Sequence, residues 1–495
     1  MLCILMVSLD MTIANVALPH IMGSLSASGD QIVWVLTSYI VASAIVTPTT
    51  GWLESRFGRK RIFIVCTLGF VAASMLCGLA ASLPQIVVFR ILQGVFGAPM
   101  SPLAQAQMLD MNPPERHGSA MALFGMGALV GPIMGPALGG YITEHLDWRW
   151  VFYINVPIGA VALLGQVAFL PSGRRPAPRR FDFVGMGMLA LSIAALQLML
   201  DRGPGEDWFS SPEIWTYAAV AAAGLWVFVF YSATTRKPFF DPRLMADRNF
   251  TINTVMGIFL FLLTGSSVAL VPPMLQTLLG YPVQTAGIVM MPRAFGTVVG
   301  MFLVGRMIGR FDHRLLLIIG IVLIGGANWS MTGFDLAMDI RPLVISSTVQ
   351  GFGMGFLMVP LSAAAFVTLP GVLRAEGSAL VSLTRSMSQG VGISLMQALL
   401  TRNTQTMHAS LAARFSFSDP VVAAALPPVL TPEAASGVAA AVNAEINRQA
   451  AMVAYVDDFK LMTIIAFACM PLVLLLTGRK KPAPSARKEL HAQAH

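Results

Sequence analysis

Long apolar stretches recur along the whole chain, and short polar segments separate them. An apolar helix needs about 20 residues to cross a bilayer, because each residue adds about 1.5 Å across a core about 30 Å thick. Stretches of this kind predict fourteen membrane-spanning helices. The expected helices cover 1–22, 33–54, 61–81, 84–108, 118–144, 150–170, 182–200, 213–232, 250–275, 284–309, 314–333, 341–369, 375–401 and 459–477.

The composition agrees with a protein surrounded by lipid. Of the 495 residues, 56% are hydrophobic and 11% are charged, and the mean hydropathy is +0.71. A soluble domain carries about 25% charged residues. One water-facing core could not bury this much apolar surface. We therefore expect an all-α membrane protein, and we exclude a soluble protein with a single anchor.

The net charge of +8 would also suit a nucleic-acid-binding protein, but the basic residues are arranged differently. The loops after even-numbered helices, together with the C-terminal tail, hold 22 of the 32 lysines and arginines. Short basic loops face the cytoplasm. We therefore expect a multi-pass protein of the bacterial inner membrane with both termini in the cytoplasm, the lipid bilayer around it and no nucleic-acid partner.

The chain begins directly in an apolar segment. Its first 22 residues lack a basic start and a small-residue cleavage site, and they carry Asp10 in the middle. These features predict a first span rather than a signal peptide. Because no cytoplasmic lead precedes this span, we expect the native start to lie upstream of Met1.

An internal repeat relates the two ends of the chain. Gln93-Gly94 is echoed by Gln350-Gly351 at an offset of 257, and Gly51 to Phe57 is echoed by Gly305 to Phe311 at 254. Chance matches between glycine-rich helices are the alternative explanation. The repeat predicts two six-helix halves with a substrate site between them near the membrane midplane. The expected parts are a first half at 1–170, a basic linker with two inserted helices and a connecting loop at 171–249, a second half at 250–477 with a long periplasmic loop at 402–458, and a cytoplasmic tail at 478–495.

Asp10 is the only acid well inside an expected span. An uncompensated charge at the middle of a bilayer costs at least about 2.5–3.5 kcal/mol. Asp10 must therefore be protonated or meet a cation, and Arg90 in the fourth helix is its natural partner if the two helices touch. Either Asp10 binds and releases a coupled proton, or it forms a fixed ion pair or hydrogen bond. Arg293 and Arg385 have no acid in the spans of their own half, so we expect them to bind backbone carbonyls, line water or reach towards the interface.

Two glycine-rich segments suggest parts that pack closely or move. Small residues at every fourth position of the fifth helix allow close helix contact, and prolines after two of them can kink it. A packing face alone would explain the glycines, whereas the doubled Gly-Pro pair favours a functional bend. The loop from Gly51 to Arg61 is either a basic anchor or, given its echo in the second half, also a gating latch. The residues concerned are Gly127, Gly131, Pro132, Gly135 and Gly139 in the helix, and Gly51, Arg56, Gly58 and Arg59 in the loop.

The sequence offers little to an enzyme. The four cysteines lie in apolar segments without paired or metal-binding spacing, which predicts buried and inert thiols. The chain lacks a His/Glu metal cluster and a buried pair of nucleophile and base. We therefore expect no metal, no cofactor and no enzymatic activity, although a membrane-embedded enzyme remains the alternative of another class.

Taken together, these motifs resemble the major facilitator superfamily, and within it the fourteen-helix drug:proton antiporters of the EmrB/QacA type, closest to the EmrB branch. The resemblance covers essentially the whole chain. In one respect the loop motif departs from the family: an acid is usual where this chain has Ser55, and Glu54 comes one residue early, so we expect a weakened charge relay in the latch. The segments that carry the resemblance are Leu9 to Pro19, Gly51 to Arg61, Arg90 to Gly94, Gly131 to Gly140, Trp148 to Pro157 and Asn447 to Phe459.

The resemblance implies a proton-coupled efflux antiporter that exports lipophilic drugs or toxic compounds by alternating access, driven by the proton gradient. It assigns proton coupling to Asp10 and Arg90, and we take Asn15, Gln93 and Gln350 as candidates to line the substrate cavity. The alternatives are an exporter of an endogenous metabolite or siderophore and, less well suited to a two-half repeat, a passive channel. EmrB-like proteins often work with a periplasmic adaptor and an outer-membrane channel, which the loop 402–458 could meet.

Overall fold

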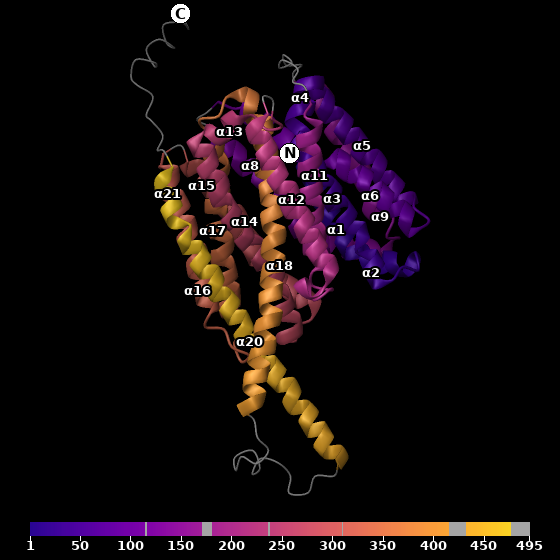
Figure 1. Cartoon of the computed structure of the whole chain (residues 1–495), viewed down its shortest axis with the longest axis vertical. Helices are drawn as coiled ribbons and strands as arrows, with labels where there is room; N and C mark the ends of the chain where they lie inside the picture. Colours follow the sequence, from indigo (N-terminus) through magenta and orange to yellow (C-terminus); the bar gives the residue numbers. More distant parts are fainter. Residues whose placement is uncertain (114–115, 171–180, 236–237, 309, 415–431, 477–495) are drawn as a thin grey trace, which may run out of the picture.

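A computed structural model describes residues 1–113, 116–170, 181–235, 238–308, 310–414 and 432–476 (Figure 1). Nearly all of the expected basic linker at 171–181 and the whole tail after 477 lie outside these residues, as do the side chains of Pro132 and Pro136. Within the described residues the chain is helical and contains no strand.

The first part of the chain forms a bundle that begins with α1, the helix that carries Asp10. The polypeptide then alternates between long helices and short breaks. The helices are α1 (Leu2–Ser24), α2 (Gly29–Ile32), α3 (Trp34–Val46), η1 (Thr47–Thr49), α4 (Thr50–Phe57), α5 (Arg59–Leu79), α6 (Leu83–Gly97), α7 (Met100–Asp110), α8 (His117–His145), α9 (Trp150–Tyr153) and α10 (Asn155–Phe169).

The remaining helices comprise two inserted ones and a second bundle. The inserted helices are α11 (Phe183–Arg202) and α12 (Pro212–Thr234), with η3 (Trp208–Ser210) between them. After α13 (Pro242–Ala246) come α14 (Arg248–Pro273), η4 (Met274–Leu278), α15 (Val283–Met307), α16 (His313–Met331), α17 (Ile340–Phe366), η5 (Gly371–Leu373), α18 (Arg374–Arg414), α20 (Pro432–Ala468) and α21 (Met470–Leu475).

Eleven stretches of described helix are long and apolar enough to cross a membrane. The other three expected spans are helical too, but they do not meet this standard. A turn at Thr47–Thr49 interrupts the span expected at 33–54, where Pro48 cannot donate a helix hydrogen bond. The spans at 118–144 and 375–401 lie within α8 and α18. The all-α membrane fold is thus confirmed, and the count of fourteen stays a prediction.

The same helix pairings occur in the first and second bundles. In the first, α1 packs along α8, and α6 packs against α3 and α5. In the second, α14 packs along α18, and α17 packs against α15 and α16. The order of these partners along the chain is the same in both bundles, which supports the two-half organisation proposed from the sequence repeat.

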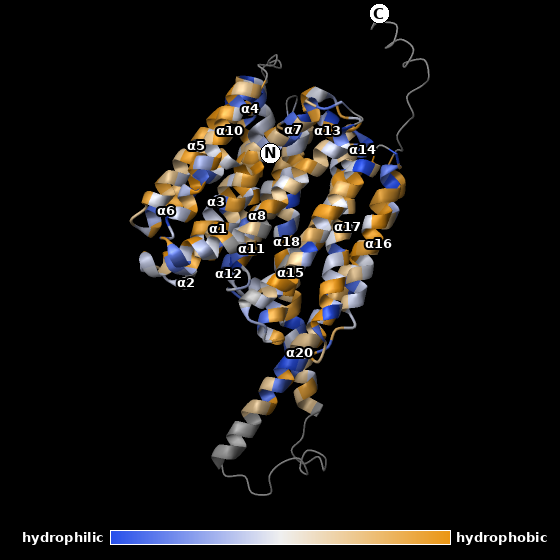
Figure 2. Ribbon diagram, turned by 180° about the vertical axis from the view of Figure 1, so that it is seen from behind, coloured by the Kyte–Doolittle hydropathy of each residue, from blue (hydrophilic) through white to orange (hydrophobic). Residues whose placement is uncertain are grey.

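The outer surface of the bundle is strongly apolar (Figure 2). Large side chains that point outward include Leu164, Phe169 and Trp226, which are 71%, 80% and 68% exposed. Exposed apolar side chains on this scale mark a surface that contacts lipid or a partner rather than water. Polar and charged residues are concentrated at the two ends and in a few internal clusters.

Much of the expected loop 402–458 is helical. Instead of ending near 401, α18 continues to Arg414, and the last long helix begins at Pro432 rather than near 459. Alanine-rich sequence favours helix strongly, which explains the extension. Figure 1 shows α18 and α20 crossing and extending beyond the bundle at the end opposite α4 and α21. His408 and Asn443 join the two extensions by a 2.8 Å hydrogen bond between their side chains.

Candidate functional site

The Asp10 carboxylate is fully buried in the middle of α1, where side chains of α6 and α10 contact it. Arg90 of α6 donates from Nη1 to Oδ2 over 2.6 Å. Gln93 of α6 and Asn155 of α10 both donate from their amide nitrogens to Oδ1, each over 2.7 Å. The carboxylate therefore receives three hydrogen bonds, one of them from a full positive charge.

Arg90 is held as firmly as the acid. Its side chain is also fully buried, and its Nε donates to the carbonyl oxygen of Val35 on α3 over 3.0 Å. The same Nη1 that binds the acid also donates to Gln93 Oε1 over 2.8 Å. The guanidinium carbon lies 4.4 Å from the centroid of the Tyr39 ring, within range of a cation–π contact. These contacts fix the orientation of the Arg90 guanidinium, and the acid that it contacts is Asp10.

Binding of a proton to Asp10 would weaken the electrostatic contact of this residue with Arg90. An arginine stays charged, so its attraction favours the ionised carboxylate. A proton on Asp10 would cancel that attraction and would turn one acceptor oxygen into a donor. The hydrogen bonds from Gln93 and Asn155 would then need to rearrange. Protonated and ionised Asp10 would therefore differ in their contacts with Arg90, Gln93 and Asn155.

Asn155 belongs to the site although the sequence did not single it out, and Asn15, a residue expected in the substrate cavity, lies apart from it. Asn155 was part of a quoted motif, but only the fold brings it to Asp10, 145 positions earlier in the chain. Asn15 lies on α1 but is exposed, and five positions from Asp10 correspond to a different face of the helix. Its role in a substrate cavity stays a prediction.

Gln350 occupies the corresponding place in the second bundle. Its amide nitrogen donates to Ser267 Oγ on α14 over 3.0 Å and to Asn328 Oδ1 on α16 over 2.7 Å. The offset of 257 that relates Gln93 to Gln350 also relates Asp10 to Ser267 and Arg90 to Ser347. The two glutamines related by the repeat thus have different partners: Gln93 contacts the acid Asp10, and Gln350 contacts the hydroxyl of Ser267. The cluster of Gln350, Ser267 and Asn328 thus has no acid at the place that corresponds to Asp10.

The glycine-rich face of α8 holds α1 in place. The positions Gly127, Gly131, Gly135 and Gly139 face Met1, Ser8, Thr12 and Val16 of α1, respectively. A Cβ atom added at Gly131 would lie 2.5 Å from the carbonyl carbon of Ser8 and 2.6 Å from the nitrogen of Leu9. The backbones of α1 and α8 therefore touch immediately beside Asp10, and α8 runs as one helix through this contact.

The segment from Gly51 to Arg59 forms part of a charged network at one end of the bundle. Glu54 accepts from Arg59 Nε over 2.7 Å, and Arg59 Nη1 lies 2.6 Å from Asp110 Oδ2. Asp110 also binds Arg374 of the second bundle over 2.5 Å. Although Ser55 stands where an acid is usual, Glu54 reaches Arg59 across the turn at Gly58, whose φ is +85°. Whether the charge relay of the latch is weakened stays a prediction.

The other latch residues divide into one contact and one exposed side chain. A Cβ at Gly51 would lie 2.8 Å from the Cβ of Glu376, so this glycine permits a close approach of α4 to α18. Arg56 is exposed at the same end. We call the group Glu54, Arg59, Asp110 and Arg374 the latch network.

Further contacts close the two bundles against each other at the latch end. Ser378 of α18 donates to Gln105 of α7, and both are buried. Gly118 of α8 lies directly against the Ile308 side chain, next to the end of α15. A Cβ at Gly125 would lie 2.9 Å from the sulfur of Met301, also on α15. The structure is therefore closed at the end that carries the latch network.

We predict that Asp110→Asn loosens this closure. The substitution removes the anion shared by Arg59 and Arg374. Each of these partly exposed ion pairs contributes about 0.2–1 kcal/mol to the stability of the closed state. Ser378→Cys in a chain lacking the four native cysteines, all buried here, would report opening. Labelling by a membrane-impermeant maleimide should become about five- to tenfold faster. Asp147→Asn, which removes an exposed partner of Arg149 elsewhere, is the control and should not change the rate. An unchanged rate in Asp110→Asn would contradict the latch.

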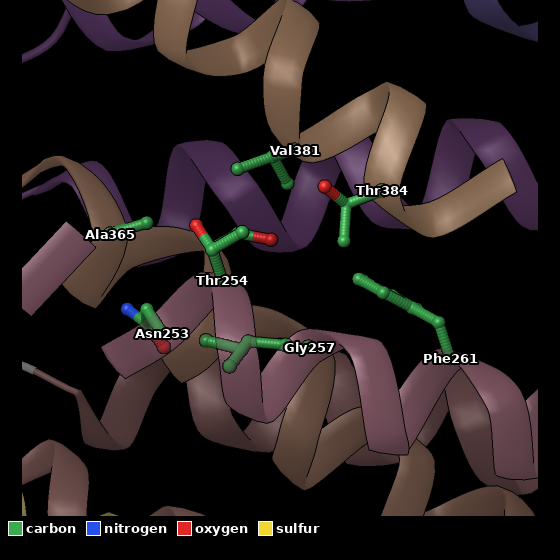
Figure 3. A pocket seen from close by; sticks show the side chains of 9 residues that line it. Asn253, Thr254, Gly257, Phe261, Ala365, Val381 and Thr384 are labelled. Carbon is green, nitrogen blue, oxygen red and sulfur yellow. The ribbon is translucent and has the colours of Figure 1, made fainter. Parts of the chain in front are cut away.

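A cavity in the second bundle lies between α14, α17 and α18 (Figure 3). It holds about 300 Å³ of empty space, including its open mouth. In Figure 3, Val381 and Thr384 project from one helix towards Thr254 and Phe261 of another. Asn253 is 3% exposed, and neither of its amide atoms has a partner in the described part of the chain. This amide was missed from the sequence, where its signal was a polar residue inside an apolar span.

No described cluster of three or more His, Cys, Asp or Glu side chains is arranged to hold a metal ion. Cys3, Cys66, Cys77 and Cys469 are free and buried, as their apolar surroundings in the sequence predicted. Among the described residues of the first bundle, Asp10 and Arg90 form an ion pair in which both side chains are fully buried.

Comparison with known proteins places this architecture in a family. The model of the Major Facilitator Superfamily matches residues 1–271. The multidrug export protein EmrB of Escherichia coli K12 is 36% identical over 406 residues, which cover 81% of this chain and 79% of that protein. This chain belongs to the major facilitator superfamily. The resemblance to the EmrB branch is thereby confirmed.

Other members of the superfamily match over similar or greater lengths. The probable multidrug resistance protein EmrY of Escherichia coli K12 is 33% identical and covers 97% of this chain and 93% of its own. The fatty acid resistance protein FarB of Neisseria gonorrhoeae is 36% identical and covers 83% and 81%. The solved structure of the proton:xylose symporter XylE covers 96% of this chain and 97% of its own, with a TM-score of 0.59 and 14% identity, which shows the shared fold.

The fold and the bacterial relatives together indicate a multi-pass transporter of the bacterial inner membrane. The superfamily provides the functional class, and the buried site has to provide the mechanism.

Proposed function

We propose that this chain is a proton-coupled antiporter that exports lipophilic compounds by alternating access. The observation that carries the proposal is the fully buried ion pair of Asp10 with Arg90, completed by Gln93 and Asn155. A titratable acid facing a fixed cation inside a membrane protein is the arrangement expected of a proton relay. The names of EmrB, EmrY and FarB support export of drugs or toxic amphiphiles.

The orientation follows from the basic loops. The latch end carries Arg56, Arg59, Lys60 and Arg61, and we propose that it faces the cytoplasm together with both termini. The structure would then be closed to the cytoplasm. In this state a proton arriving from the outside can reach Asp10, weaken its attraction to Arg90 and release substrate outward.

The return step uses the same pair in reverse. Opening towards the cytoplasm would deliver the proton there and restore the contact between Asp10 and Arg90. A proton moving inward gains about 2.3 kcal/mol per 100 mV from the membrane potential alone. That energy is enough to concentrate a substrate against its gradient. The two-half organisation, with Gln93 and Gln350 in matching places, suits such a rocking motion.

The partner of this exporter would bind at the opposite end. With the latch inside, the extensions of α18 and α20 project into the periplasm, where a periplasmic adaptor leading to an outer-membrane channel could dock. Co-purification of the full chain with such an adaptor, and its loss when residues 402–450 are replaced by a short linker, would test this.

The proposed function is tested by export from an efflux-deficient host and from inverted vesicles. The panel should hold a lipophilic cation, a neutral dye and a fatty acid, for example ethidium, Nile red and dodecanoate, each with and without an uncoupler. We expect at least one member to be exported and that export to stop when the uncoupler removes the proton gradient. Export that survives the uncoupler would contradict proton coupling. Competition by endogenous metabolites or siderophores would instead favour the alternative substrate class.

A further inference from the structure

The second bundle contains an arginine whose head group lacks a counter-charge. Nη1 of Arg293, on α15, is buried and has no hydrogen-bond partner among the described residues. The helices α14, α15, α16 and α17 contain no aspartate or glutamate, and α18 has one only at its start, Glu376. The last long helix, α20, carries Asp457, which pairs with Lys460, and the buried Asp458, and neither forms an ion pair with Arg293 in the described part of the chain. Because a guanidinium stays charged, its compensation has to come from something other than an acid of these helices.

Arg293 lines a cavity together with Ser267 and Gln350, which correspond to Asp10 and Gln93 of the first bundle. The other lining residues are Leu260, Leu263, Thr264, Ile324 and Met354. In the first bundle Arg90 of α6 meets Asp10, whereas here Ser267 stands at the position of the acid, Ser347 stands at the position of Arg90, and Arg293 comes from another helix, α15. The scaffold is repeated, but the negative charge is missing from it.

The unpaired polar atoms around this cavity include more donors than acceptors. Besides Arg293 Nη1, the buried donor Asn328 Nδ2, the acceptor Gln350 Oε1 and the hydroxyl Ser347 Oγ, which can donate or accept, lack partners in the described part of the chain. Asn328 is bound directly to Gln350, and Ser347 lies one turn before it on α17. A surplus of donors around a positive charge favours a bound anion.

The helix packing fixes Arg293 at this place. Gly351, next to Gln350, lies directly against the Arg293 carbonyl oxygen, so α17 and α15 touch backbone to backbone. The free space in the cavity is small, about enough for one water-sized group, so it could admit a small head group and not a whole drug-sized ligand. Leu260, Leu263 and Met354 give it apolar walls on which a hydrocarbon chain could begin.

We infer that the cavity around Arg293, Ser267 and Gln350 binds the anionic head group of an amphiphilic substrate, such as a long-chain carboxylate. This inference rests on the proposed export function and adds a substrate class to it. The first bundle would bind the proton, and the second would bind the anion. Lipophilic cations would have no counter-charge in this cavity.

The test compares two probes of equal chain length, dodecanoate and dodecan-1-ol, bound to the full chain in phosphatidylcholine nanodiscs at alkaline pH. Arg293→Gln should weaken dodecanoate binding by about tenfold or more, with less than a twofold change for the alcohol. Arg341→Gln, whose side chain is 89% exposed on α17, is the control for loss of one charge and should leave both affinities unchanged. Ser267→Asp should abolish the preference for dodecanoate, because it would supply the missing acid.

The opposite results would overturn the inference. Equal losses for the acid and the alcohol, or no loss in either Arg293→Gln or Ser267→Asp, would show that the cavity does not recognise charge. Displacement of dodecanoate by added phosphatidylglycerol would assign the site to a lipid head group instead. Proton-driven export of Nile red by the Arg293→Gln variant would keep the proposed function intact if the inference failed, whereas its absence in the unmodified chain as well would point to failure of the function.

Discussion

Asp10→Asn is expected to abolish proton-driven export while substrate exchange without a gradient continues. The asparagine cannot carry a proton between the two sides, so the state with Arg90 engaged and the state with it released no longer differ by protonation. Export in energised vesicles should fall to the level measured with an uncoupler. Exchange of labelled for unlabelled substrate across unenergised vesicles should persist, because it needs the rocking motion but no net proton transfer.

The control for this variant must deal with the charge it leaves behind. Removing one partner of a buried ion pair costs about 3–5 kcal/mol, because Arg90 would remain charged and unpaired. Asp10→Asn combined with Arg90→Gln removes both charges and should recover thermal stability without recovering coupling. Full gradient-driven export by a well-folded neutral pair would show that the proton travels by another route.

Gly131→Val is expected to have the largest effect on the fold. The added side chain would collide with the Ser8 side chain and with the backbone at Leu9, and backbone atoms cannot move aside without shifting the whole of α1. Overpacking of this kind typically costs about 1–3 kcal/mol. Because α1 carries Asp10, the displacement should also loosen the contact with Arg90. We expect a lower melting temperature in detergent and strongly reduced export.

The matched control lies on the same helix. A Cβ at Gly140 meets nothing within 4 Å, so Gly140→Val changes helix propensity and hydrophobicity without a collision. The two valine variants should therefore differ in melting temperature and in export. Equal behaviour of both would mean that close packing of α8 on α1 does not position the site.

The membrane fold was predictable because its main signal is local. A bilayer demands apolar runs of fixed length, and these can be read directly from the chain. The ends of α18 and α20 were less accessible, because alanine-rich segments such as 432–450 favour helix without being apolar enough to predict a span. Helix continuation beyond the bundle depends on such intrinsic propensity and on contacts like that of His408 with Asn443.

The site was predictable in its charges and not in its neutral partners. A buried acid has to be protonated or meet a cation, so Arg90 was the expected partner of Asp10 if the two helices met. Asn155, Ser267 and Asn253 carry no such demand, because a lone amide or hydroxyl in a span can be satisfied in many ways. The contact of Glu54 with Arg59 was not predicted for another reason. The turn at Gly58, and not the spacing along a helix, decides where the Glu54 side chain points.

The contrast between the two bundles is the most informative feature of this transporter. In the first bundle Gln93 contacts α1, and in the second bundle the repeat-related Gln350 contacts α14. One bundle then neutralises its arginine with Asp10, and the other leaves Arg293 beside Ser267. On our proposal the proton and the substrate head group bind in separate halves, which would move relative to one another.

Whether Asp10 carries the coupled proton can be decided by measuring proton movement itself. The full chain and Asp10→Asn are reconstituted into vesicles that contain a pH-sensitive dye, and a gradient of an exported member of the substrate panel is imposed at zero membrane potential. We expect substrate leaving through the unmodified chain to drive protons in the opposite direction, and Asp10→Asn to give substrate flux without a pH change. An equal pH change in both proteins would show that Asp10 does not carry the coupled proton.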